Sequence, residues 1–202
     1  ALVHLNIGPR AVEETDGIPT NNETVLHSLR VYAFVDGQPA GHFYTKDGLD
    51  VNNPSFLMHL TMYSTMTQKV DFYVVANEAA METPGSSVLL TENTTETQLN
   101  HFTFTKLNTS KGLPMFCKQT ETIALTQLSD KTPADPGHAG HTLLRQDLTF
   151  ELKRPIGKLG VFAAKPVGEN SSLRVTGLTV LASGTRTRNY LMPQTDETLK
   201  AI

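Results

Sequence analysis

The sequence predicts an all-β fold, a β-sandwich of about nine or ten short strands with one short helix. Apolar and polar residues alternate over short runs, as they do in strands that bury one face. Gly, Pro, Asn and Asp separate these runs at the spacing that is typical of sandwich strands. Charged residues make up only 18% of the chain, and Thr, which favours strands, is abundant. All three observations indicate a sheet-forming chain.

The first ten residues predict a short strand with one apolar face. In an extended chain His4 and Asn6 point to one side, and the aliphatic residues beside them point to the other. Taken alone, this pattern is typical of a first strand at the edge of a sheet. The alternative is a strand that is removed later. The residues that this strand would bury are Val3, Leu5 and Ile7.

A polar segment follows this first strand. Pro9 has no backbone N–H, so it ends the ladder of hydrogen bonds. The residues from Glu13 to Thr24 are mostly polar and include several turn formers. We therefore expect residues 1–25 to be a short strand on a flexible leash, with the basic residue Arg10 at the joint.

Three longer strands are expected in the first half of the chain. Leu26 to Val35 carries apolar residues on both faces, as in the middle of a sandwich. Asp36-Gly37 predicts a hairpin turn directly after it. Phe56 to Tyr63 alternates in the same way, and Val70 to Asn77 has the highest β-propensity in the chain. These runs would form the central part of the sandwich.

The second half is predicted to contain the helix and the remaining strands. Ser86 or Ser87 is a suitable cap for a short helix within Glu78 to Asn100. Tyr190 to Pro193 is expected to make a short apolar contact. Further strands are expected around Phe102 and Phe104, and at Thr122 to Leu128, Asp147 to Lys153, Lys158 to Ala164 and Leu173 to Leu181.

Composition narrows the classes of protein. The formal net charge is −3 and no basic cluster is interleaved with aromatic residues, so we expect no nucleic-acid partner. Cys117 is the only cysteine, which excludes an internal disulfide and a zinc site built from cysteines. Its apolar neighbours predict a buried, inert thiol. No apolar run is long enough for a membrane-spanning helix.

Few residues are arranged for chemistry. His138 and His141 have the spacing of a metal pair, but the Pro and Gly around them disfavour the helix that would bring both imidazoles to one face. A solvated loop is therefore the preferred interpretation. No nucleophile elbow, cysteine-protease signature or phosphate-binding loop is present. We expect no enzyme activity, no metal and no cofactor.

The order of several segments resembles the fimbrillins, the pilins of the type V pili of Bacteroidales bacteria. The resemblance begins with Ser28 to Gly37, followed by a strand near Phe56 to Met62 and by Val70 to Asn77, which ends in Val-Val-Ala-Asn. Gly112 to Met115 then matches an apolar Leu-Pro-Met element of the family. Leu148 to Val161 is similar to a later pair of strands.

The similarity spans roughly Leu26 to Met192 and includes departures. Arg154 and Lys158 occupy the basic positions of the family pattern, whereas Pro155 and Gly157 differ from it. Each motif is short, so the resemblance depends on the order and spacing of the motifs.

The resemblance implies a transthyretin-like β-sandwich without catalysis. Family members are exported as lipoproteins to the outer membrane and the cell surface. A surface protease then cleaves after an arginine near the N-terminus, and Arg10 occupies the matching place. Cleavage would remove the strand carrying Val3, Leu5 and Ile7, and a donor strand from the next subunit would replace it. The implied partners are therefore other pilin subunits, which bind by β-strand addition, and the outer membrane through an upstream lipid anchor before processing.

The resemblance also implies a domain division. Residues 1–25 would be the removable strand and its leash, and residues 26–202 the N-terminal fimbrillin-like domain, with the C-terminal domain of the family expected to be absent. Because the sequence opens directly on a strand, we expect a processed or engineered start, with the lipidated cysteine upstream.

Three functions remain open from the sequence. The first is a structural subunit of a fimbria. The second is an adhesin-type tip or anchor subunit, in which Asp47 to Pro54, Glu78 to Asn100 and Ser129 to His141 would contact a host protein or glycan. The third and weakest is a secreted hydrolase, which would need two carboxylates that only the fold brings together.

Overall fold

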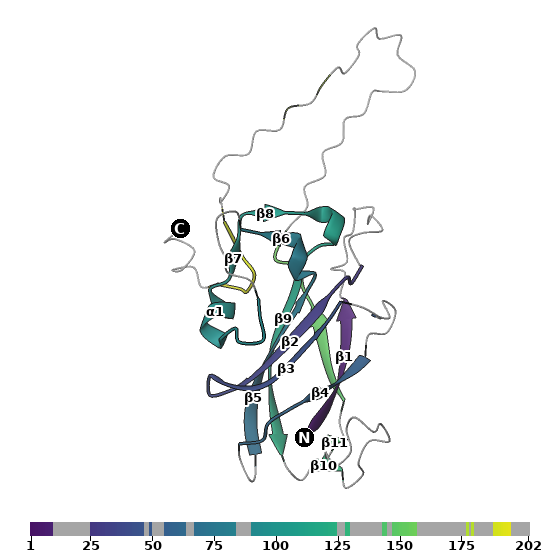
Figure 1. Cartoon of the computed structure of the whole chain (residues 1–202), viewed down its shortest axis with the longest axis vertical. Helices are drawn as coiled ribbons and strands as arrows, with labels where there is room; N and C mark the ends of the chain where they lie inside the picture. The colour runs from purple at the N-terminus through teal and green to yellow at the C-terminus, as the bar shows by residue number, and fades with distance from the viewer. Residues whose placement is uncertain are drawn as a thin grey trace, which may run out of the picture.

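The computed structural model describes residues 1–9, 25–46, 49, 55–63, 67–83, 90–124, 128–129, 143–144, 147–156, 177, 179 and 188–194. This part of the chain is built from strands arranged in sheets, with one short α-helix, so the predicted all-β sandwich is confirmed (Figure 1). The described residues form thirteen strands, more than the nine or ten expected, because six of them are only two residues long. Within the described residues, no helix is long and apolar enough to cross a membrane.

The sheet of four long strands, called the larger sheet here although the second sheet has five mostly shorter strands, is antiparallel throughout. Its strand order is β3 (Gln38–Thr45), β2 (Leu29–Val35), β5 (Thr67–Ala76) and β9 (Met115–Ala124). All seven residues of β2 are buried, because both faces of this sheet are covered, as its two apolar faces predict. The hairpin between β2 and β3 turns at Asp36 and Gly37, whose φ angles of 49° and 76° match the predicted tight turn.

The second sheet is centred on β1 (Leu2–Pro9). This strand pairs in an antiparallel manner with β4 (Ser55–His59) and in a parallel manner with β12 (Leu148–Leu152). Its first residue, Leu2, also pairs with Leu143 in β11 (Leu143–Leu144), and β11 pairs with β10 (Leu128–Ser129). The edge position expected from the local pattern is therefore wrong: β1 has neighbours on both sides, since β12 returns beside it from the far end of the chain (Figure 1).

The main core lies between these two sheets. It consists of the inward-facing apolar residues of both, and Phe72 and Phe150 contact each other across it, with ring centroids 5.3 Å apart. The members contributed by the larger sheet include Leu29, Val31, Ala33, Val35, Val70, Phe72, Val74, Met115 and Cys117. Cys117 is thus buried, as predicted.

A second layer covers the outer face of the larger sheet. It contains the 3-10 helix η1 (Glu78–Ala80), the helix α1 (Glu96–Asn100) and the 3-10 helix η2 (Thr109–Lys111). Two short ribbons complete it, in which β6 (Met81–Glu82) pairs with β8 (Lys106–Leu107) and β7 (Thr103–Phe104) pairs with β13 (Asn189–Tyr190). Its apolar cluster includes Tyr32, Tyr73, Leu99, Phe102, Leu191 and Met192. The apolar contact expected at Tyr190 to Pro193 is confirmed.

Several element boundaries differ from the predictions. The described helix begins after Thr95, which forms a capping box with Gln98, whereas Ser86 and Ser87 lie outside the described residues. The strand expected from Thr122 begins already at Met115, because Phe116 and Cys117 also fill the apolar clusters.

The remaining strand predictions have mixed outcomes. β12 confirms the strand expected at Asp147 to Lys153, and β4 ends at His59, before the expected Tyr63. The strand expected at Lys158 to Ala164, and most of the one at Leu173 to Leu181, lie outside the described residues.

Candidate functional site

The candidate site is the strand β1 together with the groove that it fills. The three residues predicted to face inward are buried: Val3 and Leu5 are 0% exposed and Ile7 is 4% exposed. The strand lies flat across the main core, so its alternation positions every second side chain between the sheets. Leu2 is also fully buried, although the alternation predicts that it faces outward.

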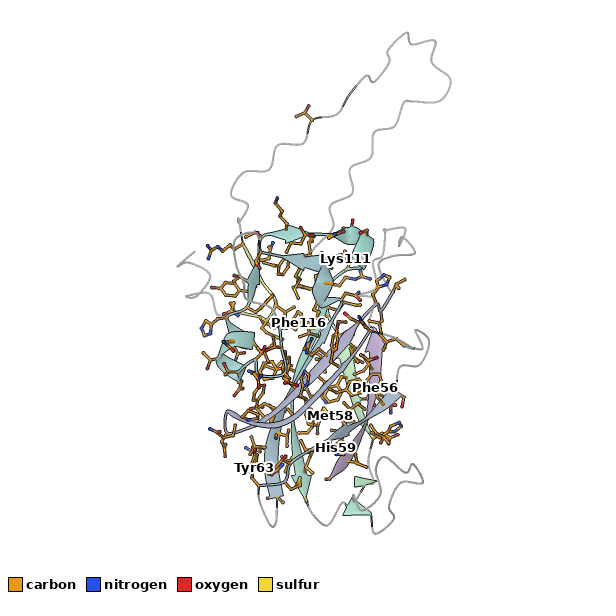
Figure 2. The ribbon with its side chains drawn as sticks, in the orientation of Figure 1. Phe56, Met58, His59, Tyr63, Lys111 and Phe116 are labelled. Atoms are coloured by element: carbon orange, nitrogen blue, oxygen red, sulfur yellow. The ribbon has the colours of Figure 1, made fainter. Side chains whose placement is uncertain are left out.

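The inward side chains of β1 lie beside large apolar residues of both neighbouring strands. Figure 2 labels Phe56 and Met58, which β4 contributes beside β1. The register aligns Val3 with Met58, Leu5 with both Phe56 and Leu148, and Ile7 with Phe150.

Backbone pairing holds β1 on both sides. Five residue pairs align it with β4 and five more with β12. The backbone ladder of β4 continues at Leu60, whose N–H donates to the carbonyl of Ala1 at 2.8 Å. Removal of β1 would therefore expose unpaired backbone groups on two strands and an apolar floor between them, which is the condition for strand addition.

Both walls of the groove are also attached to the opposite sheet without any help from β1. On one side the N–H of Thr61 donates to the carbonyl of Ala40 in β3 at 2.7 Å. At the same place Gly41 approaches β4 so closely that a Cβ on it would lie 2.4 Å from the carbonyl oxygen of His59. On the other side Phe116 and Lys153 exchange two backbone hydrogen bonds of 2.8 and 2.7 Å, which join β9 to β12.

The outer rim of the groove carries an acidic residue that contacts β1. His4 Nδ1 lies 2.9 Å from Asp147 Oδ1, and Asn6 Nδ2 donates to Asp147 Oδ2 at 3.4 Å. The other ring nitrogen of His4 contacts the hydroxyl of Ser55 on β4. The local sequence pattern does not predict Asp147 as a residue of this site, because only the parallel pairing of β1 with β12 places it beside His4.

The family model described as major fimbrial subunit protein (FimA) matches residues 1–145. The chain belongs to the FimA family. The match begins at the first residue, so it includes β1 as well as the whole of the larger sheet. The family resemblance predicted from the order of motifs is thus confirmed.

Three solved structures that are similar to this member of the FimA family are fimbrial proteins. A fimbrial assembly protein from Parabacteroides distasonis is 15% identical, with a TM-score of 0.47, and the match covers 77% of this chain and 53% of that one. A fimbrilin from Porphyromonas gingivalis is 13% identical, with a TM-score of 0.42 and coverages of 76% and 40%. A tip fimbrial protein from Porphyromonas gingivalis is 16% identical, with a TM-score of 0.41 and coverages of 77% and 49%.

The chain therefore spans about half the length, or less, of these solved proteins. A comparison with curated proteins found no match.

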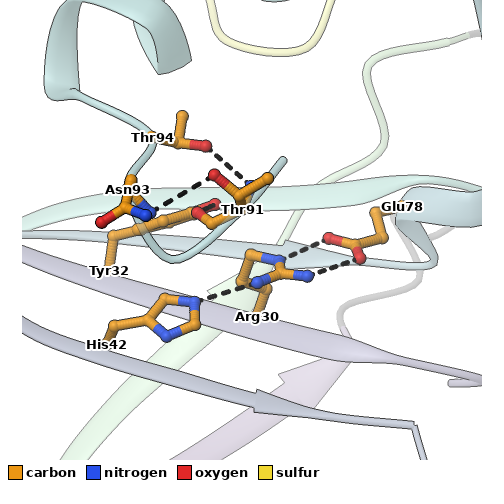
Figure 3. Close-up of polar contacts among 7 residues, drawn as sticks. All are labelled: Arg30, Tyr32, His42, Glu78, Thr91, Asn93 and Thr94. Atoms are coloured by element: carbon orange, nitrogen blue, oxygen red, sulfur yellow. Dashed lines mark hydrogen bonds and ion pairs between the residues drawn. The ribbon is translucent and has the colours of Figure 1, made fainter. Parts of the chain in front are cut away.

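A polar cluster lies between the larger sheet and the second layer of this FimA-family fold (Figure 3). Arg30 on β2 donates two hydrogen bonds, of 2.7 and 2.8 Å, to the carboxylate of Glu78. It also donates to His42 Nε2 at 3.0 Å, and its guanidinium lies 3.9 Å from the ring centroid of Tyr44. Burial and the neighbouring guanidinium lower the pKa of His42, which keeps this imidazole a neutral acceptor. These contacts fix η1 to the sheet, and we assign them a structural role.

The other sequence candidates contribute little to a site. Burial raises the pKa of the Cys117 thiol, so this cysteine stays protonated and unreactive. Arg10, His138 and His141 lie outside the described residues. Among the described residues, no three potential ligands lie close enough together to hold a metal ion.

The three loops expected to contact a ligand are only partly described. Ser129 to His141 and Asp47 to Pro54 lie almost entirely outside the described residues. The described part of Glu78 to Asn100 packs on the larger sheet through Leu90 and Leu99. This packing gives that segment a structural role in the second layer.

Proposed function

We propose that this chain is a structural subunit of a cell-surface fimbria, assembled by proteolytic loss of β1 and donor-strand exchange. Membership of the FimA family supports a role in a fimbria. The observation that carries the exchange mechanism is β1 itself, a strand whose apolar face is buried in the main core and whose backbone pairs on both sides. A strand from the next subunit would take its place, with alternate side chains in the positions of Val3, Leu5 and Ile7.

The energetics of the groove favour a long-lived exchange product. Each of the three aliphatic side chains contributes roughly 1.5–3 kcal/mol when it is buried. The two backbone ladders add to this, because their N–H and C=O groups are unpaired while the groove is empty. An added strand that buries apolar side chains in the groove and pairs with both backbone ladders should dissociate slowly, as a fibre under load requires.

The position of Arg10 supports proteolytic release. It follows Pro9, the last residue of β1, so cleavage after it would separate the whole strand from the rest of the chain. Before cleavage, the fimbrial subunit would be held at the outer membrane by a lipid anchor upstream. In this proposal residues 1–25 are the removable strand and its leash, and residues 26–202 form the domain that remains.

The test is limited digestion of the folded chain with an arginine-specific protease. We expect one early cut after Arg10, followed by slow formation of oligomers in size-exclusion chromatography and electron microscopy or by binding of an added donor peptide. An Arg10→Lys variant is the matched control, because it keeps the charge and removes the cleavage site. The proposal is wrong if Arg10 resists cleavage in the folded protein, or if the cleaved chain stays a monomer that binds no donor peptide.

A further inference from the structure

We propose that the outer rim of the groove selects the incoming strand by charge, with Asp147 as the residue that determines specificity. The added strand would need a hydrogen-bond donor or a cation at the position that His4 holds in β1. This inference rests on the proposed function, and it goes further by stating the chemistry of the partner strand.

The contacts of β1 itself show which chemistry the rim accepts. Both polar side chains on the outward face of β1 donate to the same carboxylate, His4 at 2.9 Å and Asn6 at 3.4 Å. The side chains of His4 and Asp147 are 35% and 53% exposed, so this contact lies at the surface above the buried core. When β1 leaves, the carboxylate of Asp147 loses both of these donors.

The two walls of the groove differ in charge. On β12 the residues that face outward are Asp147 just before the strand, then Thr149 and Glu151, all of them exposed. The corresponding outward residues of β4 are Ser55, Leu57 and His59, none of which is acidic. The negative charge of the rim therefore lies entirely on the β12 side of the described groove.

This asymmetry favours some strands and disfavours others. A Lys, Arg, His or Asn at the position of His4 can donate to Asp147, whereas an acidic side chain would place two like charges on neighbouring strands, which is destabilising. Because the contact is exposed, it contributes little to total affinity. The apolar floor would supply most of the binding free energy, and the rim would choose between strands that fit the floor equally well.

The same carboxylate would also fix the register. A strand displaced by one residue turns its apolar side chains to solvent, so the floor excludes that arrangement. A displacement of two residues keeps the apolar pattern but brings a different outward side chain to Asp147. The rim therefore adds a means of distinguishing these two registers.

The experiment uses the full chain with residues 12–18 replaced by the recognition sequence of a site-specific protease, so that cleavage does not depend on Arg10. After cleavage, an excess of fluorescent peptide with the sequence of residues 1–9 competes with the resident strand, and anisotropy reports its affinity. Three peptides are compared: the unchanged sequence, His4→Lys and His4→Asp. The protein variants are Asp147→Asn, Asp147→Lys and, as a control of matched charge at an exposed position in the second layer, Glu92→Lys.

With unchanged rim residues we expect the His4→Asp peptide to bind about fivefold more weakly than the other two. Asp147→Asn should abolish this difference and Asp147→Lys should reverse it, while Glu92→Lys should leave it unchanged. The difference should also shrink at high salt. Exchange of all three peptides with equal affinity would overturn the inference and leave the proposed function intact. Failure of every peptide to exchange would contradict the proposed function, and this inference with it.

Discussion

Arg30 brings a formal positive charge to a position on β2 that is only 7% exposed. Its guanidinium is matched by the carboxylate of Glu78, so the charge is buried as part of a pair. Removal of one partner from such a pair lowers stability more than replacement of both partners, because it leaves a buried charge that is desolvated and no longer compensated by its partner.

A Glu78→Gln variant should therefore lower the free energy of unfolding by about 3 kcal/mol. Urea denaturation monitored by tyrosine fluorescence measures the change. Glu92→Gln is the control, since Glu92 is exposed and its loss should change stability by less than about 0.5 kcal/mol. Equal stability of both variants would show that the pair does not hold η1 to the sheet.

Single residues also show where sequence prediction ends. The burial of Val3, Leu5 and Ile7 follows from alternation alone, and the structure confirms it. The burial of Leu2 does not follow from alternation, because it depends on which segments cover the outward face of β1. The contact of His4 with Asp147 joins residues 143 positions apart, a distance at which a local pattern carries no information.

At the scale of elements, the close contact between β3 and β4 at Gly41 determines how one wall of the groove is attached. A Cβ at this position would lie 2.4 Å from the carbonyl oxygen of His59, which belongs to the backbone and cannot rotate away. Any side chain larger than hydrogen must therefore push the two strands apart.

We expect Gly41→Ala to lower the free energy of unfolding by about 1–3 kcal/mol, as overpacking of a fixed contact does. Gly8→Ala in β1 is the matched control, because its Cβ would lie at an ordinary 3.9 Å from the carbonyl oxygen of Phe150. Thermal unfolding of both variants gives the comparison. An unchanged melting temperature for Gly41→Ala would mean that β4 can move without loss of stability.

The elements themselves were largely predictable, but their partners were not. Alternation and turn residues located β1, β2, β5 and β12, and Asp36-Gly37 located the first hairpin. The central position of β1 could not be predicted, because its parallel neighbour β12 is separated from it by most of the chain. The groove could therefore be recognised as a site only from the structure. The residues of β1 that fill it could be predicted from the sequence.

At the scale of the whole molecule, the two sheets differ in how far they depend on β1. The larger sheet does not include this strand, and both walls of the groove are bonded to the larger sheet by contacts outside β1. A molecule without a docked β1 should therefore retain the larger sheet and loosen only the smaller one.

Hydrogen exchange with mass spectrometry can follow the protection of each sheet separately. We would apply it to a Leu5→Asp variant, in which a charge at a fully buried position prevents β1 from docking. We expect amides in β4 and β12 to lose protection, and amides in β2 and β5 to keep it. Asn6→Ser, at an outward position of the same strand, should leave both sheets protected. Loss of protection in β2 and β5 as well would mean that the fold is one cooperative unit that cannot survive strand exchange.

The mixed pairing of β1 also has a consequence for the order in which the molecule is built. The hairpin of β2 and β3, and the pairing of β2 with β5, join segments that are close in the sequence. β1 leaves the ribosome before β12, yet its ladder with β12 requires residues 148 to 152. Because distant contacts close after local ones, the growing chain should complete β1 docking last. A strand that is synthesised well before its partner β12 would thus be incorporated only after β12 is made, so the vacant groove would already exist as a stage of normal folding.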